Sequence, residues 1–352
     1  MTANIAPLLL DLLRLPGVAG NETPVAERLR QAWEEVVDAQ NLDPLGNLIA
    51  VRHGSGSSPR PKIMVAAHMD SVGFRVRGIV DGFLQIAQVG RFDDRLLPGE
   101  PVTVYGTRAL PGLIFAPPPS CLPENLDGGV VPTRYLLVDL GISAREVRRI
   151  VQAGDVVSFA RAPLILEESV VVGHSLDNRA SLAAITVCLE SLADRQPAWD
   201  IFAVATVQEE TTAIGALAAA ESLGPTAAIV LDVTYGYGYA EPPHASFPLG
   251  GGPTNAWSPE IHPEIYREID AAAERSGIPV TREVLPEETG TDARGLLLAK
   301  NGIPLGVLSI PLRYMHNPGE VVLLSDIERT GMLLAEFITG LDEGFLARLG
   351  MD

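Results

Sequence analysis

The feature that most limits how this chain of 352 residues can fold is an alternation of apolar strands with helices, which stops near residue 72 and resumes near residue 165. Apolar strands are predicted at residues 62–67, 201–207, 227–233 and 304–310, with helical segments between them. Strands that alternate with helices form a largely parallel sheet covered on both faces. We therefore predict an α/β fold of three layers, α/β/α, around a mostly parallel sheet.

The stretch between these two parts has a different pattern. Segments such as 74–90 and 156–165 are short, rich in β-branched residues and broken by Gly and Pro, which is typical of strands joined by turns. One helix, opened by a capping box from Ser143 to Glu146, interrupts them. The sequence predicts a discontinuous α/β domain and an inserted β-rich domain, made of residues 1–72 with 165–352 and of residues 73–164, respectively.

Composition argues against several classes of function. Acidic residues outnumber basic ones by 44 to 26, which gives a net charge of −18 at pH 7. A nucleic-acid-binding protein needs Lys and Arg to neutralise phosphates, and anionic membranes repel an acidic surface. No apolar run approaches the roughly 20 residues of a membrane span, and the N-terminus lacks the basic region of a signal peptide. We expect no nucleic-acid partner, no membrane partner and a cytoplasmic location.

Candidate metal ligands follow the predicted strands. With only Cys121 and Cys188, the chain has no thiolate zinc site, so a metal would be held by carboxylates and some of the six histidines. In open α/β sheets, ligands bind beyond the carboxyl ends of the strands. Each candidate has an ordinary explanation on its own, such as a helix cap for an Asp, but together they indicate one site. Five segments deliver such groups to this edge, namely His68 with Asp70, Asp177, Glu209 with Glu210, Asp232 and His316.

Seven short motifs, in order and at their spacing, place the chain near a known family. They are Leu-Gly-Asn-Leu-Ile (45–49), Ala-His-Met-Asp with Val-Gly-Phe (67–74), Leu-Asp-Asn-Arg (176–179), Gln-Glu-Glu (208–210), Asp-Val-Thr (232–234), Gly-Thr-Asp-Ala (290–293) and Arg-Tyr-Met-His-Asn-Pro (313–318). Over essentially its whole length the chain resembles the tetrahedral aminopeptidases and glutamyl aminopeptidases. These are cytoplasmic dinuclear metallopeptidases that are sometimes called endoglucanases.

The resemblance implies a metal centre and an assembly. His68 and Asp232 would bind one divalent ion, Glu210 and His316 a second, and Asp177 would bridge both. The inserted domain would be barrel-like and would build homo-oligomers, namely dimers and often twelve-subunit shells. Carboxylate and imidazole ligands suit Zn²⁺ best here, and also Co²⁺ or Mn²⁺.

The resemblance also implies roles for two further acids, Glu209 as the general base and Asp70 behind His68. Two divalent ions lower the pKa of a shared water and polarise the scissile carbonyl. Glu209 would take the proton from this water and return it to the leaving amine. Asp70, two residues after His68 on an extended strand, points to the same side and is expected to accept the other imidazole N–H. Asp292 is a candidate for binding the substrate's α-amino group.

We therefore predict a metal-dependent aminopeptidase that acts on short peptides. The main alternative is a metal-dependent deacylase or deblocking enzyme for N-acyl amino acids or peptides, since the same water chemistry serves both. A glycoside hydrolase needs two carboxyl groups in a cleft usually lined with aromatic residues, and only 5% of the residues are aromatic. A non-catalytic assembly protein would not need the complete ligand set.

Four departures from the family pattern leave the ligands in place. They are expected to affect the substrate pocket or the assembly rather than the metals. They lie at Ser71, Thr211–Gly215, Thr289 and Arg294.

Overall fold

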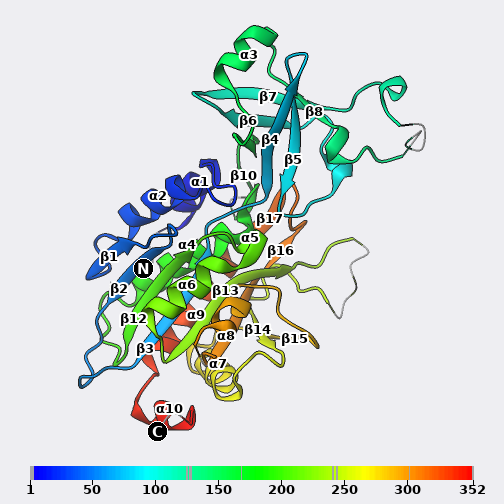
Figure 1. Ribbon diagram of the computed structural model, residues 1–352. Helices are drawn as coiled ribbons and strands as arrows, with labels where there is room; N and C mark the ends of the chain where they lie inside the picture. Colours follow the sequence, from blue (N-terminus) through cyan, green and yellow to red (C-terminus); the bar gives the residue numbers. More distant parts are fainter. Residues whose placement is uncertain are drawn as a thin grey trace.

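The computed structural model describes residues 4–350 except 124, 125, 127, 128, 168, 240, 241, 243, 244 and 301. Its two parts are a large sheet with helices on both faces and a closed β-barrel, which lies beyond one edge of the sheet (Figure 1). The prediction of a three-layer α/β fold with an added β-rich, barrel-like part is confirmed. No helix in the described ranges is both long and apolar enough to cross a membrane.

The large sheet is parallel at its centre and antiparallel toward its edges. β3 pairs in parallel with β12 and with β13, and β13 pairs in parallel with β16, so four strands present their carboxyl ends on the same side. Its strands run in the order β1 (Ala39–Leu42), β2 (Leu48–Arg52), β12 (Asp200–Thr206), β3 (Lys62–His68), β13 (Ala227–Tyr235), β16 (Leu305–Arg313), β17 (Glu320–Leu323), β11 (Val170–Gly173) and β10 (Leu164–Leu166), with β14 (Thr254–Trp257) and β15 (Thr281–Val284) branching from β16.

Alternating side chains of the central strands feed two hydrophobic cores. In β3, Ile63, Val65 and Ala67 face one core, and Met64 and Ala66 face the other. This is the period of two that a strand buried on both faces requires. The first core is covered by α1 (Ala6–Arg14), α2 (Thr23–Trp33), α4 (Leu176–Ser191), α7 (Pro263–Ser276), α9 (Leu324–Thr339) and α10 (Glu343–Arg348), and the second by α6 (Ile214–Leu223) and α8 (Ala293–Leu298).

The barrel closes on its own core of apolar side chains. Phe74, Leu84, Ile114, Val138 and Val157 are all fully buried inside it, as expected for a small barrel filled by side chains. Helix α3 (Ala144–Ile150) begins with the predicted capping box. The strands are, in order around the barrel, β4 (Gly73–Val80), β5 (Phe83–Val89), β8 (Leu137–Asp139), β7 (Ala109–Phe115), β6 (Pro101–Tyr105) and β9 (Val156–Phe159).

The barrel is attached directly at the carboxyl edge of the sheet. β3 ends at His68 and β4 begins at Gly73, so four residues connect the two parts. Short helix α5 (Glu209–Thr212) follows β12 at the same edge. This junction is where the predicted metal ligands lie.

Candidate metal centre

Three buried side chains form the first group of possible metal ligands. His68 ends β3 and Asp232 lies in the neighbouring parallel strand β13. The Nε2 atom of His68 is 3.1 Å from Oδ1 of Asp177 and 3.9 Å from Oδ1 of Asp232. One potential ligand atom from each of the three residues lies within 4.8 Å of the others. We call His68, Asp177 and Asp232 the buried ligand group.

A second group adjoins the first and shares Asp177 with it. The other carboxylate oxygen of Asp177, Oδ2, lies 3.2 Å from Nε2 of His316. That imidazole nitrogen is 3.6 Å from Oε2 of Glu210. We call Asp177, Glu210 and His316 the open ligand group, because Glu210 and His316 are only partly buried. The geometry thus places all five sequence-predicted ligands together, with Asp177 between the two sets.

The electrostatics of this cluster fit divalent cations. Burial raises the pKa of Asp232 to about 8, and burial together with neighbouring acids raises that of Glu210 well above its usual range. Burial alone would lower the pKa of His68, but hydrogen bonds to Asp177 and Asp70 outweigh it, and the pKa is raised well above the ordinary value. Within the described residues, no Lys or Arg forms an ion pair with Asp177, Glu210 or Asp232. Buried carboxylates need cationic partners, and carboxylate–imidazole sets suit divalent metals.

Glu209 lies beside both groups but belongs to neither. Its Oε2 atom is 3.9 Å from Nε2 of His68, and the side chain lines the cleft above the ligands. Burial raises the pKa of Glu209 to about 9, and Asp232 and Asp292 add to that rise. A carboxylate that faces the cleft without being required as a ligand is available for proton transfer.

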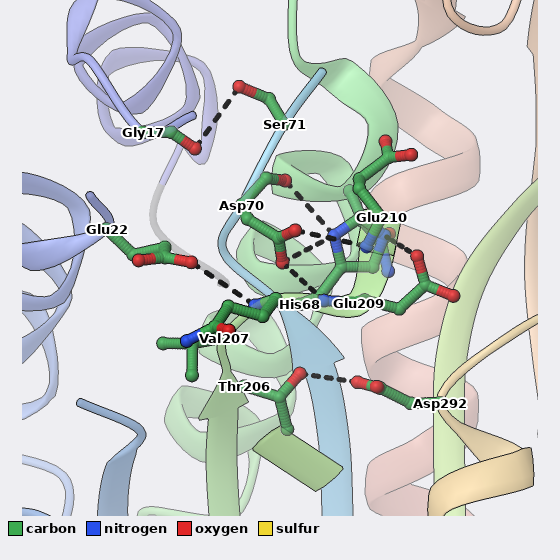
Figure 2. A network of polar contacts seen from close by, with 12 residues as sticks. Gly17, Glu22, His68, Asp70, Ser71, Thr206, Val207, Glu209, Glu210 and Asp292 are labelled. Atoms are coloured by element: carbon green, nitrogen blue, oxygen red, sulfur yellow. Dashed lines mark hydrogen bonds and ion pairs between the residues drawn. The ribbon is translucent and has the colours of Figure 1, made fainter. Parts of the chain in front are cut away.

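Asp70 is fully buried, and its hydrogen bonds differ from the expected ones. Its carboxylate accepts the backbone N–H of Glu209 at 2.9 Å and that of Glu210 at 3.1 Å (Figure 2). The Nδ1 atom of His68 lies closer to the Asp70 backbone carbonyl, at 3.1 Å, than to its carboxylate, at 3.6 Å. Asp70 therefore fixes the backbone that carries the Glu209–Glu210 pair, and its carbonyl faces the imidazole.

Two buried carboxylates with a similar role were not found in the sequence. Glu320 accepts the backbone N–H groups of Asp177, at 3.1 Å, and His316, at 2.9 Å. Glu22 accepts those of Gly20, at 2.7 Å, and Gln208, at 3.2 Å. A single Glu before an apolar strand or at a helix start looks like an ordinary surface residue. The sequence offers one indirect indication for Glu320, which is that it lies only four residues after the predicted ligand His316.

Asp292 lies behind the ligands rather than in the cleft. It is almost fully buried and accepts a hydrogen bond from the Thr206 hydroxyl (Figure 2). Burial raises its pKa to about 6. Its Oδ1 atom has no hydrogen-bond partner among the described residues, and it is not one of the side chains that line the cleft. Its position offers a substrate amine no direct contact.

The cleft above the ligands has a volume of about 870 Å³, which suits a short peptide. Of the departures from the family pattern, Thr211, Thr289 and Arg294 line it. Ser71 is buried elsewhere and donates a hydrogen bond to the Gly17 carbonyl at 3.3 Å (Figure 2). The other lining residues are of mixed character and include Arg91, Thr234, Tyr235, Phe247, Glu283, Val284, Leu285 and Met315.

Solved structures with this fold define the class of protein as a peptidase. An aminopeptidase from Desulfurococcus kamchatkensis has 29% sequence identity and a TM-score of 0.90, with 98% of this chain and 97% of that chain covered. The TET1 peptidase of Pyrococcus horikoshii, which can assemble into a tetrahedron or a large octahedral shell, has 27% identity and a TM-score of 0.83, covering 96% and 100% of the two chains.

The family follows from the sequence comparisons. The pattern of the M42 glutamyl aminopeptidases matches residues 46–333. The lysyl aminopeptidase of Pyrococcus furiosus is 32% identical over 331 residues, which cover 92% of this chain and 93% of that protein. The chain belongs to the M42 glutamyl aminopeptidase family, and the resemblance found in the motifs is confirmed.

Proposed function

We propose that this protein is a dinuclear metal-dependent aminopeptidase that removes N-terminal residues from short peptides. The observation that carries the proposal is the position of Asp177, whose two carboxylate oxygens face His68 at 3.1 Å and His316 at 3.2 Å. A carboxylate shared in this way can bridge two ions roughly 3.5–4 Å apart. Membership of an aminopeptidase family and a cleft sized for a short peptide support the same activity.

In this proposal His68 and Asp232 would hold one divalent ion, Glu210 and His316 would hold the second, and Asp177 would be common to both. The ions, zinc in preference to cobalt or manganese, supply an activated water and polarise the scissile carbonyl when bound. The three carboxylates compensate most of the positive charge that two such ions bring into the buried edge of the sheet.

Glu209 is proposed to move the proton. Its pKa of about 9 belongs to the metal-free site, and two divalent cations beside it would lower that pKa. In the ionised form Glu209 would accept a proton from the attacking water and donate it to the amine that leaves. Asp70 contributes by holding the N–H groups of Glu209 and Glu210, which keeps the base and the adjacent ligand in a fixed relation. The proposed division of labour within the Glu-Glu pair rests on their partners. Glu210 lies 3.6 Å from His316 in the open ligand group, and Glu209 lies 3.9 Å from His68 without belonging to either group.

The test of the base is the substitution Glu209→Gln. We expect turnover to fall by about 10²–10⁴-fold, the usual contribution of a general acid–base group, while metal content stays unchanged. Glu274→Gln, at an exposed position of α7, is the matched control and should behave as wild type. Activity of Glu209→Gln within tenfold of wild type would exclude this role.

A deacylase with the same metals is the second candidate, and a free-amine requirement separates the two. Aminoacyl-anilides and their N-acetylated counterparts are compared on the same metal-loaded protein. The aminopeptidase proposal predicts cleavage of the free-amine substrates only. Preferential cleavage of the acetylated series would establish the deacylase instead.

We also propose that residues 73–164 form a separate domain that builds homo-oligomers, dimers at least and a dodecameric shell at most, around a catalytic domain of residues 1–72 and 165–352. The TET1 peptidase of Pyrococcus horikoshii, to which this chain is similar, can assemble into a tetrahedron or a large octahedral shell. Exposed apolar side chains within residues 73–164, at Val80, Leu96 and Leu113, support an interface on this domain. Light scattering after size exclusion measures the assembly, and a monomer would contradict the proposal.

A further inference from the structure

The irregular first turn of α4, which carries Asp177, and the loop after β16, which carries His316, meet on one buried carboxylate, that of Glu320. Oε2 of Glu320 accepts the N–H of Asp177 at 3.1 Å, and Oε1 accepts the N–H of His316 at 2.9 Å. The side chain is 1% exposed and contributes no atom to either ligand group. Both hydrogen bonds therefore hold the backbone of the two ligand residues rather than a metal ion.

Glu320 is itself held at a fixed place in the sheet. It is the first residue of β17, which pairs with β11 on one side and with β16 on the other. β11 leads to Asp177 and β16 leads to His316. One residue at the junction of three strands thus sets the separation of two segments that lie 139 positions apart in the sequence.

These segments need support because their backbone is in an unfavourable region. Ser175, Tyr314 and His316 have φ angles of 68°, 63° and 60°, in the left-handed region that non-glycine residues rarely adopt. Such conformations are unfavourable for non-glycine residues and persist where surrounding contacts determine them. The two N–H bonds to Glu320 are contacts of that kind.

We propose that Glu320 is a positioning residue that holds His316 against Asp177 and thereby sets the affinity of the open ligand group for its metal. The inference rests on the proposed dinuclear function and deepens it. The buried ligand group shares Asp177, but its other members, His68 and Asp232, lie on strands that Glu320 does not touch. Loss of Glu320 therefore weakens the second ion selectively.

The test is Glu320→Gln, which keeps the size of the side chain but replaces one acceptor oxygen with an NH₂ group. Metal-free protein is titrated with Co²⁺ by calorimetry. We expect the first equivalent to bind nearly as in wild type and the second to bind about 10–100-fold more weakly, the usual effect of losing a residue that orients a ligand. Excess Co²⁺ should restore kcat, which it would not do if the substitution merely loosened the fold.

Asp326→Asn is the matched control. Asp326 is also a fully buried carboxylate, and it accepts two backbone N–H groups, from Gly250 at 2.6 Å and Gly252 at 3.0 Å. It should lose stability without losing affinity for either ion. Glu320→Asp, which keeps both oxygens but withdraws them, gives a second variant if the amide fails to fold, and its second ion should also bind more weakly.

Two results would overturn the inference. One is binding of both ions to the Glu320 variants within threefold of wild type, and the other is equal weakening in Asp326→Asn. Because the titration does not depend on turnover, a wild-type protein that binds two ions but cleaves no peptide would reject the proposed function and leave the role of Glu320 intact. A wild-type protein that binds no second ion would reject both.

Discussion

The two ligand groups share Asp177 but are built on different kinds of backbone. In the buried ligand group, His68 and Asp232 lie on the parallel strands β3 and β13 and are 2% and 6% exposed. In the open ligand group, His316 has a φ of 60°, and Glu210 lies two residues after Gln208, whose φ is 59°. The Glu210 side chain is 6% exposed and that of His316 is 34% exposed. One half of the site belongs to the sheet, and the other half lies on the short helix α5 and on the loop after β16.

This difference indicates that the two ligand groups are held in place in different ways. Strand positions are fixed by the hydrogen bonds of the sheet, so the buried ligands lose little freedom when an ion binds. The ligands of the open group depend on buried carboxylates, Asp70 for Glu210 and Glu320 for His316. We expect tighter binding and slower exchange at the buried group, and easier access for substrate at the open group.

The largest effect should come from the residue that the two groups share. The substitution Asp177→Ala removes a ligand from both ions. Both ions should then bind weakly, and the difference in metal affinity between the two ligand groups should disappear. Turnover should fall by at least about 1,000-fold, equivalent to roughly 4 kcal/mol of lost stabilisation. Metal analysis after dialysis and steady-state kinetics measure these effects. Retention of one tightly bound ion would contradict a bridging role.

A smaller, one-sided effect separates the groups. The His316→Ala variant should keep one ion per subunit and bind the other more than about 100-fold more weakly than wild type. The loss is larger than for a residue that only orients a ligand, because the substitution removes a ligand itself. His68→Ala should disturb the tightly bound ion instead. Titration of each metal-free variant with Zn²⁺ distinguishes the two patterns. If both variants lost the same ion, the asymmetry described here would be wrong.

The smallest effect is a dependence of metal affinity on pH. The pKa of Asp232 is raised to about 8 in the metal-free site by burial, so below pH 8 an ion must displace a proton from it. The pKa of His68 in the same group is also raised well above its ordinary value. Affinity at the buried group should therefore fall as pH falls, by about tenfold per pH unit for each proton that the ion displaces. Titrations at pH 6, 7 and 8 measure the slope. An affinity that is independent of pH would show that Asp232 is already ionised.

The sequence predicted those parts of the site that depend on the ends of strands. His68 and Asp232 follow from the rule that ligands gather at the carboxyl edge of a parallel sheet, and the motifs supplied the shared role of Asp177. The β-rich character of residues 73–164 could also be recognised in the sequence, because their short strands and frequent turns contrast with the long apolar strands on either side. These features are local, so they can be recognised without knowing the fold.

The supporting carboxylates could not be predicted in the same way. Asp70 was expected to face His68, because residues two apart on a strand point to the same side. Its carboxylate instead accepts the backbone N–H groups of Glu209 and Glu210, which lie 139 and 140 residues away in the sequence. The partners of Glu320 lie on two separate segments, one of them 143 residues away. Asp292 was considered for the substrate amine, yet its hydrogen bond goes to Thr206 behind the ligands. Such contacts exist only after distant segments have come together.

The most direct test of the central claim combines metal titration with activity. Metal-free protein is titrated with Zn²⁺ while hydrolysis of an aminoacyl-anilide is followed, with the N-acetylated anilide as the control substrate. The two-metal aminopeptidase proposed here predicts little activity at the first equivalent, a rise during the second, saturation near two ions per subunit, and no cleavage of the acetylated substrate. Full activity at one equivalent or without metal, or cleavage of the acetylated substrate, would contradict it.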